Sequence, residues 1–303
     1  MADSLRDIRE NIKNVKNIQQ IMNTMKMISS ARIKKAQGQI LSSRPFATKM
    51  RDMLHELEID AKENDSPIKD SWAYSFFENL PNTDKNVIGI ILVTADKGLC
   101  GGFNAVLIKE ALDIIYKNKD KKIYLFLMGK KGRDFLGKLD NKNIEIVYEA
   151  VDIFPKINYA NATLLGDNLV KTYLEKKLSK VYLVFNEFKS MASQRLISQE
   201  LLPFNFSDLE AEHPNIKSNF LFEPNERAFF ELLLPRYIKV QLYRFLLESQ
   251  AAELAARLLA MDAAGKNAGD IVEELSLKLN RTRQELITSE LSEIIGGAEA
   301  LKS

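Results

Sequence analysis

The chain has 303 residues, of which 46% are hydrophobic and 28% charged, and this balance excludes a disordered protein and indicates a globular one. The net charge of +2 gives the chain as a whole no general affinity for polyanions. The single cysteine, Cys100, excludes a disulfide framework, and two histidines without a Cys/His cluster argue against a zinc site.

The charge is unevenly distributed along the chain. Residues 1–51 hold eleven Lys/Arg against three Asp/Glu, a local charge of +8, whereas residues 226–303 hold ten basic and twelve acidic residues. A basic segment can bind nucleic acid, acidic protein or anionic lipid, and composition does not choose among them. The N-terminus lacks the apolar core of a signal peptide, and no apolar run approaches the ~18 residues of a membrane span, so we expect any membrane role to be peripheral.

The N-terminal segment predicts one long helix. Apolar residues recur at spacings of three and four, and no Pro or Gly interrupts the pattern before Gly38. Asp3 or Ser4 is suited to cap its start, and the helix is expected to continue to about residue 60. The residues of this apolar stripe are Leu5, Ile8, Ile12, Val15, Ile18, Met22 and Met25.

The middle of the chain alternates between two kinds of segment. Short runs rich in β-branched and aromatic residues predict strands, and the segments between them predict helices. Strands joined by helical crossovers are typical of a mostly parallel α/β sheet, and residues 193–204 are candidates for a further strand. The predicted strands are 87–93, 122–128, 143–149 and 180–186, and the predicted helices are 105–118, 130–139 and 160–178.

The C-terminal segment has a heptad pattern. Apolar or small residues alternate spacings of four and three, and a strict 3.5-residue period implies a left-handed supercoil with a second helix. Pro235 is suited to the first turn of this helix, which would extend roughly 90 Å to about residue 295 at ~1.5 Å per residue. The residues of this stripe are Leu247, Ala251, Leu254, Leu258, Met261, Gly265, Ala268, Val272, Leu275, Leu279, Thr282 and Leu286.

A helix of that length needs a partner, and the N-terminal helix is the candidate that the chain offers. We therefore predict an α/β protein in which the N- and C-terminal helices form a long antiparallel coiled coil and a Rossmann-like α/β domain is inserted between them. The expected boundaries are residues 1–60 and 220–303 for the two helices of the shaft and 75–205 for the α/β domain.

The glycine-rich segment TADKGLCGGFN, residues 94–104, does not match a nucleotide-binding motif. Its glycines fall at positions 98, 101 and 102, which fit neither G-x-G-x-x-G nor a P-loop, where Phe103 would have to be glycine. Asp96 follows a strand, where ligands of α/β proteins bind, but no other polar residue converges on it. We therefore expect a sharp strand-to-helix turn with Lys97 and Cys100 facing outward.

Three stretches together resemble one family, the γ subunit of F-type ATP synthase. They are DIRENIKNVKNIQQIMNTMKMISSARIKKAQ (7–37), the glycine-rich segment 94–104, and NRTRQELITSELSEIIGGAEAL (280–301). They follow the family's order and involve almost the whole chain. The bacterial form is indicated because the disulfide-forming insertion of the chloroplast form is absent.

The resemblance implies a non-catalytic rotor subunit. Its terminal helices would form a shaft inside a hexamer of α and β subunits, and its α/β domain would lie beside ε and the ring of c subunits. Proton-driven rotation would then cycle the catalytic β subunits for ATP synthesis, and ATP hydrolysis would reverse it and pump protons. No cofactor, nucleic acid or small-molecule ligand is implied, and the expected location is peripheral, on the cytoplasmic face of the bacterial inner membrane.

The resemblance also implies contact residues. Arg283 and Gln284 match a pair that binds a catch loop of β, with Thr288, Glu290 and Lys26 assigned to the same level. Lys97 and Cys100 are expected beside the acidic DELSEED segment of β. Phe220, Phe222 and Glu223 resemble the foot that meets ε and the c-ring.

Two other classes of protein stay open when the residues alone are considered. A Rossmann-type enzyme with coiled-coil arms would bind a nucleotide, which the missing fingerprint disfavours. A nucleic-acid adaptor using the basic first helix would bind DNA with a steep salt dependence, and the scarcity of stacking aromatic residues there disfavours it.

Overall fold

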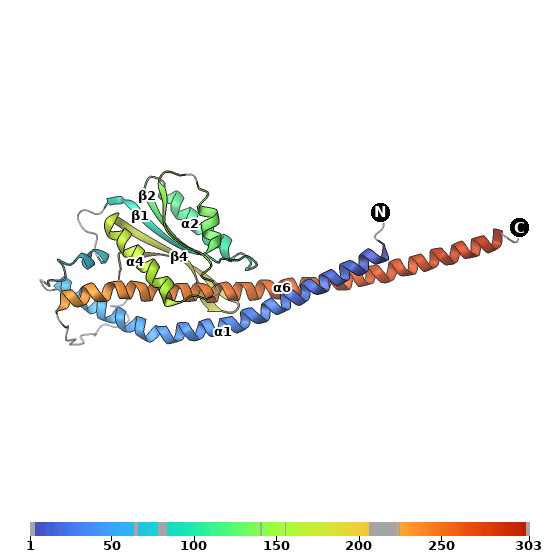
Figure 1. Cartoon of the computed structure of the whole chain (residues 1–303), viewed down its shortest axis with the longest axis horizontal. Helices are drawn as coiled ribbons and strands as arrows, with labels where there is room; N and C mark the ends of the chain where they lie inside the picture. The colour runs from blue at the N-terminus through green and yellow to red at the C-terminus, as the bar shows by residue number, and fades with distance from the viewer. Residues whose placement is uncertain are drawn as a thin grey trace. The chain divides into compact units, whose positions relative to one another are not determined.

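The computed structural model describes residues 4–63, 66–77, 84–139, 141–154, 156–205, 223 and 225–300. The chain divides into two compact units, one formed by residues 1–29 with 257–303 and the other by residues 30–256. Helices α1 (Leu5–Glu63) and α6 (Glu226–Ala300) each contribute residues to both units (Figure 1).

The larger unit contains a five-stranded sheet in the order β3-β2-β1-β4-β5. The first four of these strands along the sheet pair in parallel, and β5 pairs antiparallel with β4 at one edge, so the mostly parallel sheet expected from the sequence is confirmed. The strands are β1 (Asp84–Val93), β2 (Lys122–Met128), β3 (Ile144–Ala150), β4 (Leu178–Ser190) and β5 (Ser193–Leu202). The helices between them are η1 (Trp72–Phe76), α2 (Phe103–Lys117), α3 (Lys130–Leu136) and α4 (Tyr159–Glu175).

Both faces of the sheet are covered, which explains why its central strands are continuous apolar runs. Along β2, Ile123, Leu125 and Leu127 point into a core shared with α2 and α3. The alternate residues Tyr124 and Phe126 point into a larger core shared with η1, α4 and the parts of α1 and α6 that belong to this unit. Figure 1 shows α2 and α4 beside the sheet. The period of two along each strand therefore divides the side chains between two helical layers.

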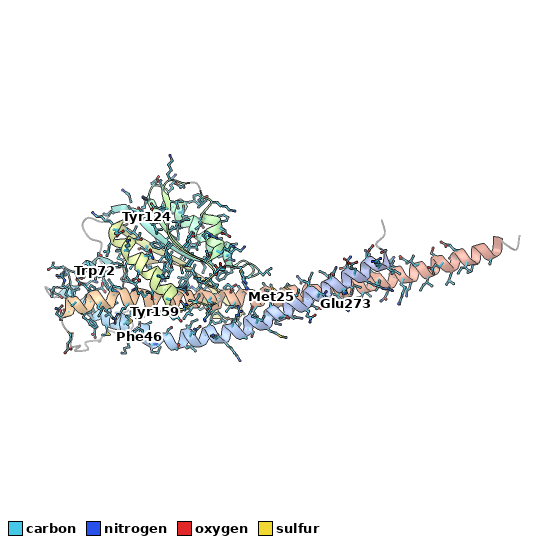
Figure 2. All side chains as sticks on the ribbon, viewed as in Figure 1. Met25, Phe46, Trp72, Tyr124, Tyr159 and Glu273 are labelled. Carbon is cyan, nitrogen blue, oxygen red and sulfur yellow. The ribbon has the colours of Figure 1, made fainter. Side chains whose placement is uncertain are left out.

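In the smaller unit, α1 and α6 run antiparallel. The ammonium of Lys26 lies 2.5 Å from Asp262 Oδ1, and the side-chain amide of Gln19 donates to the carbonyl of Gly265 at 3.3 Å. Residue numbers therefore decrease along α6 as they increase along α1, which is the order expected for antiparallel helices. Figure 2 labels Met25 on α1 and Glu273 on α6 among the side chains of this unit.

The contact seam differs from the predicted stripe at two positions of α1: Gln19 replaces Ile18, and Lys26 replaces Met25, which is itself half-buried. Ile18 is 49% exposed, and the half-buried side chain of Gln19 takes its place in the seam. With Gln19 included, the spacings alternate strictly between three and four from Leu5 to Ser29. The prediction that Ile18 lies in the seam is wrong. It rested on the apolar side chain, whereas the heptad register determines which residue faces the other helix. The buried or half-buried seam residues are Leu5, Ile8, Ile12, Val15, Gln19, Met22, Lys26 and Ser29.

The starts of both long helices are set by polar caps. Ser4 and Asp7 exchange side-chain to backbone hydrogen bonds at 3.2 Å, so the expected cap at Ser4 is confirmed. The expected start of α6 at Pro235 is wrong, because the helix begins at Glu226, where the side chain of Asn225 accepts from the amide of Ala228 at 2.8 Å. Pro235 lies inside the helix and removes one backbone donor, which the burial of neighbouring apolar side chains outweighs.

Gly265→Leu is expected to separate the two helices of the smaller unit. A Cβ at this position would lie 3.2 Å from Oδ1 of Asn23 and 3.9 Å from Cβ of Met22, so the longer side chain of leucine would press against both residues of α1. Overpacking of this kind costs about 1–3 kcal/mol, measurable by urea unfolding followed by circular dichroism. Ala263→Leu, on an exposed position of the same turn, is the matched control. Equal stability of the two variants would contradict the register described here.

Candidate functional site

The carboxyl edge of the parallel sheet is occupied by the protein itself. Asp96, three residues beyond β1, is 5% exposed and accepts three backbone hydrogen bonds of 2.8 Å. The donors are the amide of Lys130 at the start of α3 and the amides of Asp152 and Phe154 after β3. A carboxylate whose two oxygens already accept three amides is a structural link between three segments, and it is not available to a ligand.

Two glycines after β2, Gly129 just before α3 and Gly132 in the first turn of α3, bring the backbone against Thr94. Gly129 has a φ of 93°, and a Cβ there would lie 2.0 Å from the carbonyl oxygen of Thr94. The amide of Gly132 donates to the hydroxyl of Thr94 at 2.8 Å. In a nucleotide-binding α/β protein such glycines bring the backbone close to a phosphate, whereas here they bring it close to another loop.

The glycine-rich segment after β1 is closed by Asn104, the second residue of α2. Its side-chain oxygen accepts from the amide of Ala95 at 2.9 Å, and its amide donates to the carbonyl of Lys97 at 3.5 Å and to the sulfur of Cys100 at 3.2 Å. This segment forms the strand-to-helix turn that the glycines predict. Its three glycines do not all adopt unusual backbone angles, since only Gly101 among them has a positive φ, of 57°.

The expectation that Cys100 faces outward is wrong. Its side chain is 1% exposed and packs in the core between the sheet, α2 and α3. Cysteine behaves as a small apolar residue, and the turn rotates it inward while Leu99, with a φ of 63°, occupies the exposed position. We therefore do not expect Cys100 to form a disulfide with a partner protein in this conformation. Lys97 is exposed, as expected.

The residues expected to contact a partner near the C-terminus lie on one exposed stretch of α6. Arg283, Gln284, Thr288 and Glu290 are all exposed, and the hydroxyl of Thr288 donates to the carbonyl of Gln284 at 2.9 Å. These side chains are held on one helix within two turns, in positions from which they can contact another chain.

Lys26 has a partner within the chain that the sequence analysis missed. Asp262 Oδ1 accepts from the ammonium of Lys26, and Lys266 lies 2.9 Å from Oδ2 of the same carboxylate. Hydrogen bonds from Lys26 first, and then from Lys266, lower the pKa of Asp262 from 3.8 to about 2. The sequence indicates this ion pair only through the opposite charges of residues 26 and 262. The pair can be predicted from them only when the register of the two helices is known.

The expected foot can be examined at one position. Glu223 is exposed, whereas Phe220 and Phe222 lie outside the described residues. Among the helices that the structure describes, none has a stretch of sufficient length and apolar character to cross a bilayer.

Comparison with known proteins gives concordant matches over nearly the whole chain. A family model described as ATP synthase matches residues 4–301. The ATP synthase gamma chain of Elusimicrobium minutum is 50% identical over 301 residues, and that of Chlorobaculum tepidum is 36% identical over 304 residues; each match covers 99% of both chains.

The solved structures are similar in fold. A chain of the Euglena gracilis mitochondrial ATP synthase (OSCP/F1/c-ring) is 19% identical, with 98% of this chain and 94% of that chain covered and a TM-score of 0.64. A chain of the Tetrahymena thermophila mitochondrial ATP synthase central stalk/c-ring is 23% identical, with 80% and 99% covered and a TM-score of 0.58.

Asp96→Asn is expected to destabilise the larger unit. An amide offers one acceptor oxygen where the carboxylate offers two, and its NH₂ group would face a backbone donor. Hydrogen bonds to a charged group contribute about 1.5–3 kcal/mol each, so we expect a loss on the order of 3 kcal/mol in the free energy of unfolding. Asp120→Asn, at an exposed position after α2, should change it little. A stable Asp96→Asn variant would show that the three contacts are dispensable.

Proposed function

This chain belongs to the ATP synthase gamma-chain family and is a central-stalk rotor subunit of an F1Fo ATP synthase, and from that premise we propose that it transmits rotation without itself binding or hydrolysing a nucleotide. The edge of the sheet where a Rossmann-type protein binds its cofactor is filled by Asp96, Thr94 and the loop at Gly129. The chemistry of ATP therefore belongs to other subunits, and this chain acts through its surfaces.

The observation that carries this proposal is the exposed end of α6. From residue 283 to residue 298 every residue is exposed, and within the described part of the chain no second helix covers this stretch. Five large apolar side chains are exposed there: Leu286, Ile287, Leu291, Ile294 and Ile295. A single helix with such a surface needs a surrounding protein. We propose that α and β subunits form an apolar sleeve around it.

The coupling that we propose follows from two kinds of contact. The helical pair would lie within the ring of α and β subunits, and the α/β unit would bind ε and the c-ring, with Glu223, Phe220 and Phe222 at the foot. Rotation of the c-ring would turn the helical pair and so change the conformation of each β subunit in sequence. The same contacts would run in reverse when ATP hydrolysis pumps protons.

Specific contacts with β are proposed for two surfaces. Arg283 and Gln284 would bind a catch loop of one β subunit, supported at the same level by Thr288, Glu290 and the half-exposed ammonium of Lys26. Lys97, on the turn after β1, would meet the acidic segment of β. Carboxylates on β are suitable partners for both, because charge complementarity orients an encounter even where it adds little stability.

The location that we propose is the cytoplasmic face of the bacterial inner membrane, with attachment through the complex. The absence from the sequence of the disulfide-forming insertion typical of the chloroplast form supports the bacterial assignment.

The function is tested by assembly and by energy conversion. The tagged full chain, co-expressed with α, β and ε, should recover all three subunits, and membranes containing the complete complex should pump protons on addition of ATP. Calorimetric titration of the isolated chain with ATP and magnesium should give no binding heat. Recovery of the chain without α and β would contradict the rotor assignment, and micromolar ATP binding would contradict its non-catalytic role.

Arg283→Ala is expected to reduce coupling more than assembly. A hydrogen bond from a guanidinium to a partner carboxylate contributes about 1.5–3 kcal/mol, and this bond would form in only some rotational states. Complex yield should stay near the wild-type level while ATP-driven proton pumping falls several-fold. Arg281→Ala is the matched control, since Arg281 is 83% exposed on the same helix and pairs with Glu285 of its own chain. Equal ATP-driven proton pumping by the two variants would show that Arg283 does not bind the catch loop of β.

Lys97→Glu is expected to lower coupled turnover without changing the fold. The side chain is exposed, so reversal of its charge leaves the core intact and places a carboxylate opposite the acidic segment of β. The effect on ATP-driven pumping should be largest at low ionic strength, because salt screens exposed charges. Lys117→Glu, at the opposite end of α2, serves as control. A salt-independent effect, or none, would be evidence against this contact.

A further inference from the structure

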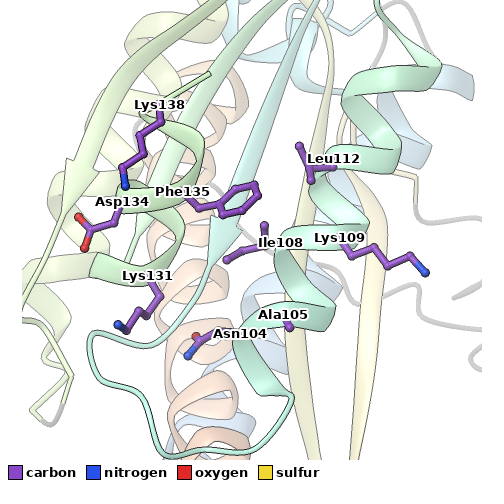
Figure 3. A pocket seen from close by; sticks show the side chains of 9 residues that line it. All are labelled: Asn104, Ala105, Ile108, Lys109, Leu112, Lys131, Asp134, Phe135 and Lys138. Atoms are coloured by element: carbon purple, nitrogen blue, oxygen red, sulfur yellow. The ribbon is translucent and has the colours of Figure 1, made fainter. Parts of the chain in front are cut away.

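A groove of about 550 Å³ runs between α2 and α3 (Figure 3). It lies on the side of these helices that faces away from the sheet core, since Leu107 of α2 and Leu136 of α3 point into that core. The residues that line it are Asn104, Ala105, Ile108, Lys109 and Leu112 of α2, and Lys131, Asp134, Phe135 and Lys138 in and after α3.

The floor of the groove is apolar. Ile108 and Leu112 are half-buried, and Phe135 is 48% exposed. Figure 3 shows the side chains of Ile108, Leu112 and Phe135 directed toward the space between the two helices. An apolar floor with a polar rim is the arrangement found at the centre of protein interfaces.

The rim of the groove is basic. Lys109, Lys131 and Lys138 are all exposed, and none of the three takes part in an ion pair among the residues that the structure describes. The one acidic residue of the lining, Asp134, is bound by Arg133 at 2.9 Å. Three lysines around an apolar floor therefore present a positive surface that carboxylates complement.

The polar groups next to the groove are already used, which disfavours a phosphate or another small polar ligand. At the start of α3, the amide of Lys130 donates to Asp96, that of Lys131 to the carbonyl of Ala95, and that of Gly132 to Thr94. The side chain of Asn104 is bound to the loop before α2. The first-turn amides of α3 are therefore already bonded within the chain, and a small ligand would find lysine ammonium groups without fixed geometry.

We propose that the α2–α3 groove is a docking surface for an acidic amphipathic helix of a partner protein. Apolar side chains of that helix at positions i, i+3 or i+4, and i+7 enter the groove and contact Ile108, Leu112 and Phe135. Its flanking Glu or Asp residues meet Lys109, Lys131 and Lys138. The inference goes beyond the rotor function and does not depend on it, because the groove lies wholly within the α/β unit.

The test uses the full chain and a designed probe. The probe is a fluorescein-labelled helical peptide of about 18 residues, with leucines at i, i+3, i+4 and i+7 and glutamates on both flanks. Two further peptides replace the glutamates by lysines or the leucines by serines. Fluorescence anisotropy should show binding of the acidic probe alone, weakening as salt is raised.

Variants of the chain locate the binding. Phe135→Glu should reduce affinity for the probe at least tenfold, because it places a carboxylate in the apolar floor. Tyr116→Glu is the matched control, since Tyr116 is an aromatic residue of α2 that is 68% exposed and does not line the groove. The double variant Lys131→Glu with Lys138→Glu should reduce affinity similarly and does not alter the floor. Circular dichroism establishes that each variant is folded.

Three results would overturn the proposal. The acidic probe could fail to bind the wild-type chain, or bind Phe135→Glu and Tyr116→Glu equally well. Equal affinity for the acidic and the lysine-flanked probe would mean that the basic rim plays no part. The third result is binding of a DNA duplex that the double lysine variant loses and Phe135→Glu retains. It would show that these lysines bind a polyanion and not an acidic helix.

Discussion

The carboxylate of Asp96 is the interaction on which the α/β unit depends. β1, β2 and β3 are three of the four parallel strands that end at the same edge of the sheet, and each is followed by a segment whose amides need acceptors. A single buried side chain supplies them for two of these segments, and the hydroxyl of Thr94 supplies another. Because the edge is closed in this way, the place where related folds bind a cofactor is a rigid junction here, and the surfaces left for recognition are the outer faces of the helices.

The sequence predicted the architecture well because its signals were local. Continuous apolar strands, amphipathic helices and a sustained heptad are visible in any short window, and the parallel sheet and the antiparallel helices followed from them. The wrong predictions concern positions whose structure is determined by contacts with residues far away in the sequence. Ile18 was placed in the seam for its hydropathy, although Gln19 satisfies the register. Pro235 was taken as a start signal, although the cap of Asn225 and the burial of apolar neighbours extend the helix to Glu226.

The candidate site was less predictable than the fold. Exposure of Lys97 and of the residues around Arg283 could be expected from polar side chains on a turn and on a helix. The burial of Cys100 could not, because a short turn can place either of two neighbouring residues inward and the choice depends on Asn104 and the core below. The pair formed by Lys26 and Asp262 joins residues that are far apart in sequence, and the lysine-rimmed groove exists only once α2 and α3 pack side by side on the sheet.

The polar contacts in the helical seam have a mechanical consequence. Sliding one helix along the other by a single residue moves it ~1.5 Å, which is enough to break the hydrogen bond from Gln19 to the carbonyl of Gly265 and to separate Lys26 from Asp262. The two contacts therefore oppose axial sliding of one helix past the other and hold the pair in a single register, so the height of each level of α1 relative to α6 is set by named polar side chains as well as by apolar packing.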